Sequence, residues 1–138
     1  MADDEVARLL ATLPERVRRD SETLIALMER ATGQPPEVHD GRSVGFGSYH
    51  YEYPTGRQGD AAAAGFWPRA RETSIYFGEG LGFHEEALAK LGPHRAAVVC
   101  VYVRSLDGID LAVLEQMVRE SYARLTAGVY SSRARHPT

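Results

Sequence analysis

The segment that most constrains this 138-residue chain runs from Ser43 to Tyr53, where tyrosines alternate with other side chains. A repeat of two residues is that of a β-strand, because successive side chains point to opposite faces of a sheet. One face of the predicted strand carries Val44, Phe46, Ser48 and His50, and the other carries Tyr49, Tyr51 and Tyr53. The chain is therefore expected to contain a sheet with a run of tyrosines on one face.

Helical repeats lie on both sides of this segment. Apolar residues three and four positions apart predict helices at about 3–13, 14–33 and 84–91, and a final helix that follows Asp107 or Asp110 and reaches Leu125. Gly33 and the Pro35-Pro36 pair end the second helix, because glycine favours the left-handed cap and proline cannot continue a helix.

Three more segments have strand character, and they complete the predicted fold. They are Ala61–Trp67, Glu72–Gly78 and Ala97–Arg104, which gives the order α-α-β-β-β-α-β-α with a loop at 37–42. Short links predict an antiparallel sheet of about four strands, and the apolar stripes of the long helices need one of its faces. We expect a single α+β domain over 1–138, with a frayed tail at 129–138.

Charge and cysteine content narrow the partners and the compartment. The chain has 16 basic and 19 acidic residues, a net charge of −3, so neither a nucleic acid nor a membrane is expected as a partner. One cysteine excludes an internal disulfide, and the acidic start Met1–Glu5 is unlike a signal peptide. No apolar run approaches the roughly 20 residues of a membrane span. These features predict a cytoplasmic protein.

Several motifs occur in the order seen in a bacterial family of domains of unknown function. They are Gly45-Phe46-Gly47-Ser48-Tyr49-His50-Tyr51, Gly65-Phe66-Trp67-Pro68-Arg69, Leu91-Gly92-Pro93-His94, Cys100-Val101-Tyr102 and Asp110-Leu111-Ala112-Val113-Leu114. From about Leu9 to Leu125 the chain resembles the YdhG-like proteins. The resemblance implies a frataxin-like fold, with terminal helices packed on an antiparallel sheet. Some members are described as intracellular iron chaperones, so iron is the one cofactor that the resemblance suggests.

The aromatic residues of the sheet are the favoured candidate site. Aromatic rings with hydroxyl ends, joined by arginines, can line a pocket for a small planar or anionic ligand. The predicted ligand-binding residues are Tyr49, Tyr51, Phe66, Trp67, Arg69, Tyr76, His94, Arg95, Cys100 and Tyr102. Tyrosine and arginine are also enriched in interface cores, so a homodimer or another protein–protein contact is an alternative. Packing under the helices is the simpler explanation for about half of the aromatic residues.

Metal binding and catalysis have less support in the sequence. His39 and Asp40 are weak candidate metal ligands, because a site needs a further ligand that the spacing does not name, and a solvated surface loop is the favoured explanation of the pair. The acidic residues of the second helix are interleaved with arginines, as in ordinary helix ion pairing. The chain lacks a nucleophile elbow, a phosphate loop and a paired zinc-ligand motif, so no catalytic residue is predicted.

Overall fold

The computed structural model describes residues 2–131, which fold into four α-helices and six strands. The helices are α1 (Ala2–Ala11), α2 (Glu15–Thr32), α3 (Glu85–Leu91) and α4 (Leu111–Thr126), with a 3-10 turn at Leu81–His84. The strands are β1 (Pro36–His39), β2 (Ser43–Glu52), β3 (Gln58–Pro68), β4 (Thr73–Tyr76), β5 (Arg95–Ala96) and β6 (Cys100–Val103). None of the described helices combines the length and the apolar character needed to cross a membrane.

The six strands form one antiparallel sheet in the order β1-β2-β3-β4-β6-β5. The α+β class and the antiparallel pairing are confirmed, but the predicted four strands and their order are wrong. Residues 37–42 are not all loop, because Pro36–His39 pairs with β2. β5 has two residues, too few to show an alternating pattern, and β1 begins within the Pro35-Pro36 pair, which favours a loop in the sequence.

The pairing register sorts the side chains of the sheet into rows. Val44, Phe66, Ile75 and Val101 lie opposite one another across β2, β3, β4 and β6, and all are buried in the core. The next row holds Gly45, Gly65, Tyr76 and Cys100. Adjacent rows face opposite sides of a sheet, so this second row faces away from the core.

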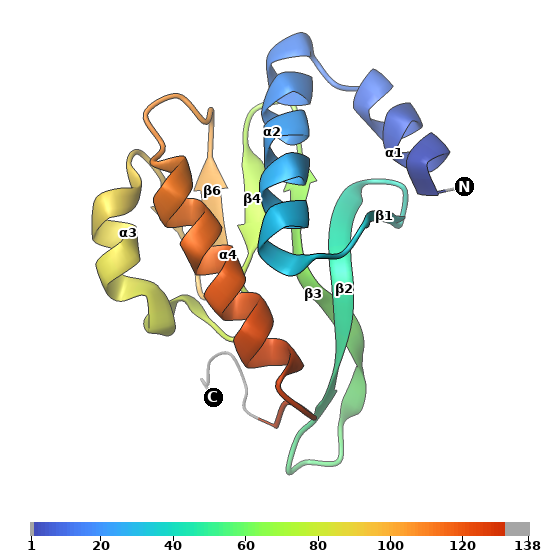
Figure 1. The fold of residues 1–138 in the computed structure, drawn as a ribbon, viewed down its shortest axis with the longest axis vertical. Coiled ribbons are helices and arrows are strands. Elements are labelled where there is room, and N and C mark those ends of the chain that lie inside the picture. Colours follow the sequence, from blue (N-terminus) through green and yellow to red (C-terminus); the bar gives the residue numbers. More distant parts are fainter. Residues whose placement is uncertain (1, 132–138) are drawn as a thin grey trace.

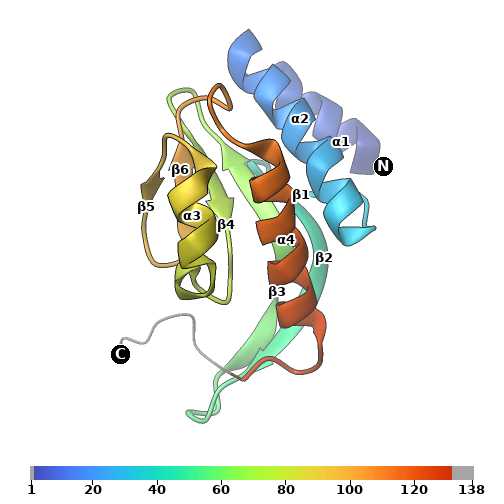
Figure 2. The same ribbon diagram turned by 60° about the vertical axis from the view of Figure 1, so that its left-hand side comes forward.

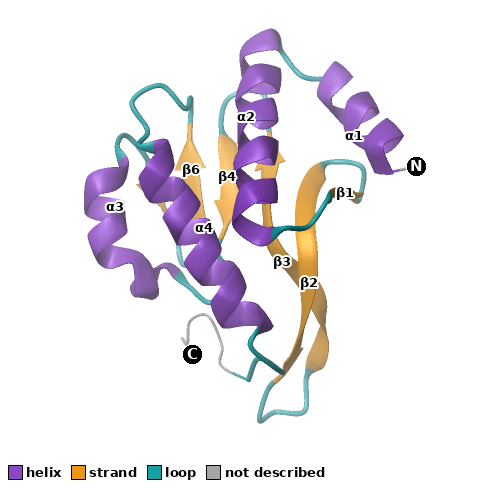
Figure 3. Ribbon diagram, viewed as in Figure 1, coloured by secondary structure: helices purple, strands orange, loops and turns teal. Residues whose placement is uncertain are grey.

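The long helices α2 and α4 pack side by side on the core face (Figure 2). Asp110 caps α4, since its side chain accepts hydrogen bonds from the backbone N–H groups of Ala112 and Val113. Gly33 ends α2 in the left-handed conformation at φ 72°, as its position before the two prolines predicts. The opposite face of the sheet has no helix over it among the described residues (Figure 3).

The strands differ greatly in length, and this shapes the open face. β3 has 11 residues and pairs with β2 along most of its length, but with β4 only from Gly65 to Pro68. Within residues 2–131, the part of β3 from Gln58 to Ala64 therefore has a strand neighbour on one side only. Together β2 and β3 extend beyond the other strands as a two-stranded ribbon (Figure 1).

The end of this ribbon holds part of the segment predicted to be a frayed tail. The backbone of Tyr130 bridges Tyr51, with hydrogen bonds from Tyr130 N to His50 O and from Glu52 N to Tyr130 O, both 2.9 Å. The prediction is wrong for Tyr130, because a turn after α4 returns the chain to the sheet edge. Residues 132–138 of the predicted tail lie outside the described part of the chain.

Candidate functional site

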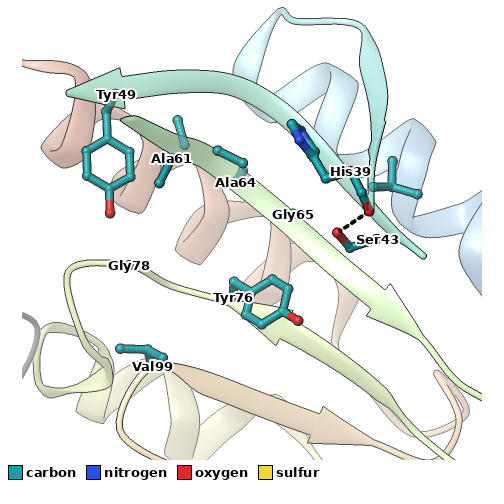
Figure 4. A pocket seen from close by; sticks show the side chains of 13 residues that line it. His39, Ser43, Tyr49, Ala61, Ala64, Gly65, Tyr76, Gly78 and Val99 are labelled. Carbon is teal, nitrogen blue, oxygen red and sulfur yellow. Dashed lines mark hydrogen bonds between the residues drawn. The ribbon is translucent and has the colours of Figure 1, made fainter. Parts of the chain in front are cut away.

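A hollow of about 420 Å³ lies where β3 loses its second strand neighbour. Its walls come from the middle of β3, from the loop after β4 at Gly78, and from Val99 (Figure 4). Tyr49 and Tyr76 stand at opposite ends of it, and His39 lies on the side of β2. We refer to it as the Tyr49–Tyr76 hollow. Its volume lies within the range of small-molecule sites, about 300–1,000 Å³.

The lining of this hollow is built largely from small residues. The four alanines Ala61–Ala64 line it from β3, and Gly45 and Gly65 pair across β2 and β3 beside them. A Cβ atom at Gly45 would come within 2.7 Å of His39 Nε2, and one at Gly65 would come within 2.7 Å of the Val44 carbonyl oxygen. Larger residues at these two glycines would therefore displace the His39 ring or the β2 backbone.

Tyr49 closes the end of the hollow nearest α4. A Cβ atom at Gly78 would lie 2.9 Å from Tyr49 Oη and 3.3 Å from a methyl carbon of Leu125, so the chain is tightly packed here. Burial, helped by the neighbouring tyrosines Tyr53 and Tyr130, raises the pKa of Tyr49 to about 12. Its phenol is consequently neutral at physiological pH and can donate a hydrogen bond to a ligand.

Tyr76 closes the other end, close to positive charge. Burial raises the pKa of the Tyr76 phenol, while Arg69 and Arg42 act in the opposite direction. Both guanidinium groups lie over the ring of Trp67, at 4.6 Å for Arg69 and 5.0 Å for Arg42. Arg69 also donates a 2.8 Å hydrogen bond to Ser74 Oγ, which fixes it on the open face two residues from Tyr76. This end of the hollow is therefore the better place for an anionic group.

The remaining predicted polar residues form a second, separate group on β5 and β6. The Arg95 guanidinium lies 4.1 Å from the Tyr102 ring centre and 2.7 Å from Glu72 Oε2. His94 Nδ1 donates a 2.8 Å hydrogen bond to the Gly92 carbonyl. With Glu72, these residues line a hollow of about 330 Å³ that does not include Tyr49 or Tyr76.

Three further predicted ligand-binding residues do not line the Tyr49–Tyr76 hollow. Phe66 is fully buried in the core, because it neighbours Trp67 in the strand and must face the opposite side. Cys100 is buried next to Tyr76, and burial raises the pKa of its thiol despite the hydrogen bond from Tyr102 and the charge of Arg69. Tyr51 lies on the ribbon, where its ring stacks on Tyr53 at 5.1 Å.

Most residues that line the Tyr49–Tyr76 hollow lie outside the predicted ligand-binding set. Alanine has no polar or reactive side-chain group, so Ala61–Ala64 do not point to a site. Four alanines in a strand beside a tyrosine-rich strand nevertheless indicate a face with unfilled space. His39, a candidate metal ligand with Asp40 in the sequence, has its ring beside Gly45 in the structure. Asp40 lies in the tight turn to β2 at φ 56°. No three histidine, cysteine, aspartate or glutamate side chains of residues 2–131 converge as a metal site would require.

Comparisons of the chain with protein-family models, with curated proteins and with solved structures found no match.

Proposed function

We propose that the chain binds a small, flat, mainly apolar molecule with one anionic end in the Tyr49–Tyr76 hollow. The observation that carries the proposal is the combination of an alanine- and glycine-lined cavity with two tyrosines at its ends. Apolar walls with a few placed polar groups are the usual composition of a small-molecule site. Of the ten predicted ligand-binding residues, Tyr49 and Tyr76 line this hollow and the others do not.

The charges near the hollow support a single orientation of the ligand. Arg42 and Arg69 lie at the Tyr76 end, whereas the Tyr49 end closes on Gly78 and Leu125. An aromatic carboxylate would place its ring on the alanines and its carboxylate toward the two arginines, whose planar donors match it. A hydroxyl group at the opposite end would meet the phenol of Tyr49.

Titration of the protein with 2-naphthoate, followed by calorimetry and by amide NMR shifts, tests the proposal. Neutral 2-naphthylmethanol serves as the ligand control, and we expect it to bind at least about tenfold more weakly because it lacks the charge–charge contact. Ala61→Phe fills the hollow and is expected to abolish binding, whereas Ala123→Phe places the same side chain on the exposed surface of α4 and leaves it unchanged. Equal binding by both variants would refute the site.

The YdhG-like assignment, its frataxin-like fold and a cytoplasmic location are retained as proposals. An α+β chain with an antiparallel sheet is what that assignment requires at the coarsest level. The family's iron-chaperone activity and a homodimeric role stay as predictions. Calorimetric titration with ferrous iron tests the first, and the mass in solution at two protein concentrations tests the second.

A further inference from the structure

Four arginines from distant parts of the chain surround another hollow at one end of the sheet, and one of them, Arg69, also lies near the Tyr76 end of the Tyr49–Tyr76 hollow. Arg16 comes from the first turn of α2, Arg69 and Arg71 from the β3–β4 turn, and Arg104 from the end of β6. The space they enclose with Glu72 measures about 790 Å³. We call it the arginine hollow. Its residues are too far apart in the sequence for charge patterning to reveal it.

The positive charges of the arginine hollow are not balanced by the protein. Among the described residues that line it, Glu72 is the only carboxylate, and its Oε2 atom already accepts hydrogen bonds from Arg69 at 3.2 Å and from Arg95 at 2.7 Å. The guanidinium groups of Arg71 and Arg104 form no hydrogen bond or ion pair with any described residue. Four positive charges against one negative charge leave an excess of three, in a chain whose net charge is −3.

Two of these arginines are held in place by contacts that keep them at the hollow. Arg69 is fixed by Glu72, by Ser74 and by the face of Trp67. Arg16 donates a hydrogen bond to the backbone carbonyl of Arg104, which links α2 to the end of β6. Like charges repel, so converging arginines without acidic partners are costly unless an anion joins them.

We propose that the arginine hollow binds an oligophosphate, as the inorganic anion or as the phosphate chain of a nucleotide. Guanidinium groups present planar pairs of donors that fit phosphate oxygens, and several groups are needed for an anion with three or more charges. A single sulfate would engage only part of a space of about 790 Å³. Glu72 and Arg104 also line the neighbouring hollow of His94, Arg95 and Tyr102. A base attached to the phosphate chain could stack there on the Arg95 guanidinium, which itself lies 4.1 Å from the Tyr102 ring centre.

Calorimetric titrations of the full chain at low ionic strength, with tripolyphosphate, ATP and sulfate in turn, test this site. We expect tripolyphosphate to bind with a dissociation constant below about 1 mM, and sulfate at least about tenfold more weakly. ATP binding tighter than tripolyphosphate identifies a nucleotide as the preferred source, and the reverse order identifies the inorganic anion. Either order supports the proposal, whereas equal binding of sulfate and tripolyphosphate would overturn it.

The double variant Arg71→Gln/Arg104→Gln removes the two unpaired guanidinium groups and should weaken tripolyphosphate binding at least about tenfold. The matched control Arg8→Gln/Arg57→Gln removes the same charge from exposed positions on α1 and on the β2–β3 turn, and should bind normally. Thermal melts of both variants should match the wild type, since none of these four side chains has a described partner. Equal affinity of the two double variants would contradict a localised site.

Discussion

The Glu79 carboxylate and the His84 imidazole are 2.7 Å apart, and both side chains are fully buried. Ser121 donates a 2.6 Å hydrogen bond to the same carboxylate, and Arg124 lies 2.8 Å from it. This network ties the loop after β4 to α4. Because that loop also supplies Gly78 to the Tyr49–Tyr76 hollow, the network holds one wall of the candidate site.

Replacing Glu79 should destabilise the protein and change its response to acid. Burial pushes the pKa of Glu79 upward, but hydrogen bonds from His84 and Ser121 outweigh it and hold the pKa below the ordinary value of 4.5. A carboxyl group with a lowered folded-state pKa stabilises the fold fully above its unfolded pKa, and this contribution is lost as the pH falls below that value. Glu79→Gln should lower the free energy of unfolding at pH 7 by about 2 kcal/mol or more.

Urea denaturation at pH 7 and at a series of pH values below 4.5 measures both effects. The difference in unfolding free energy between the wild type and Glu79→Gln should become steadily smaller as the pH falls through this range. The exposed Glu86→Gln of α3 removes one carboxyl group without touching the network and should behave as the wild type. A difference in unfolding free energy that does not change with pH would show that the carboxylate charge is not the stabilising feature.

Tyr49 should limit stability at alkaline pH. Its folded-state pKa of about 12 lies above the ordinary 10.0, so its contribution is complete below pH 10 and is lost as the pH rises toward 12. Tyr49→Phe cannot ionise, and its unfolding free energy should therefore fall less than that of the wild type over this interval. Ultraviolet titration of the phenolates gives an independent check, since the variant should lack one late-ionising tyrosine. Identical titration curves would contradict the burial of Tyr49.

Cys100 should react slowly with alkylating reagents in the native protein. The thiolate is the reactive form, and burial of Cys100 both raises the thiol pKa and blocks access. Iodoacetamide labelling followed by mass spectrometry should be at least about tenfold slower in buffer than in guanidinium chloride, where the chain is unfolded. Comparable rates in the two solvents would show that the strand face around Tyr76 opens readily.

Gly47 should not tolerate a side chain. It has φ 67°, and a Cβ atom there would lie 3.0 Å from the Tyr122 ring and 3.1 Å from Gln34. Gly47→Ala should lower the free energy of unfolding by about 1–2 kcal/mol, because L-residues with a Cβ atom disfavour this backbone region. Gly128→Ala is the control, since its Cβ atom would meet nothing within 4 Å and its φ is not in the left-handed region. In thermal denaturation, Gly47→Ala should melt at a clearly lower temperature than Gly128→Ala.

The sequence predicted the parts of the fold that repeat along the chain. Alternation over residues 73–77 placed Thr73 and Ile75 together, and both are buried in the structure. Helical spacing located α2 and α4, and Asp110 is the N-cap of α4 of the two candidates, Asp107 and Asp110, that the sequence offers. Periodicity predicts these elements because apolar residues recur on the side of a helix or strand that is buried.

The features that were missed depend on contacts between distant segments. Glu79 stands between two glycines and reads as part of a turn, yet its partners come from the 3-10 turn and from α4. The arginine hollow likewise needs α2, the β3–β4 turn and the end of β6 to meet. The prediction that Phe66 shares a face with Trp67 is wrong, because adjacent residues of a strand face opposite sides of the sheet and Phe66 lies in the core.

The difference in length between β3 and β4 makes the Tyr49–Tyr76 hollow a property of the backbone rather than of any one side chain. An 11-residue strand beside a four-residue strand leaves a gap in the sheet whatever residues line it. Substitutions at Ala61–Ala64 can therefore change the size and the chemistry of the cavity while the gap itself persists. A chain with the same strand lengths would have a recess at this position, and the residues at 61–64 would set its size.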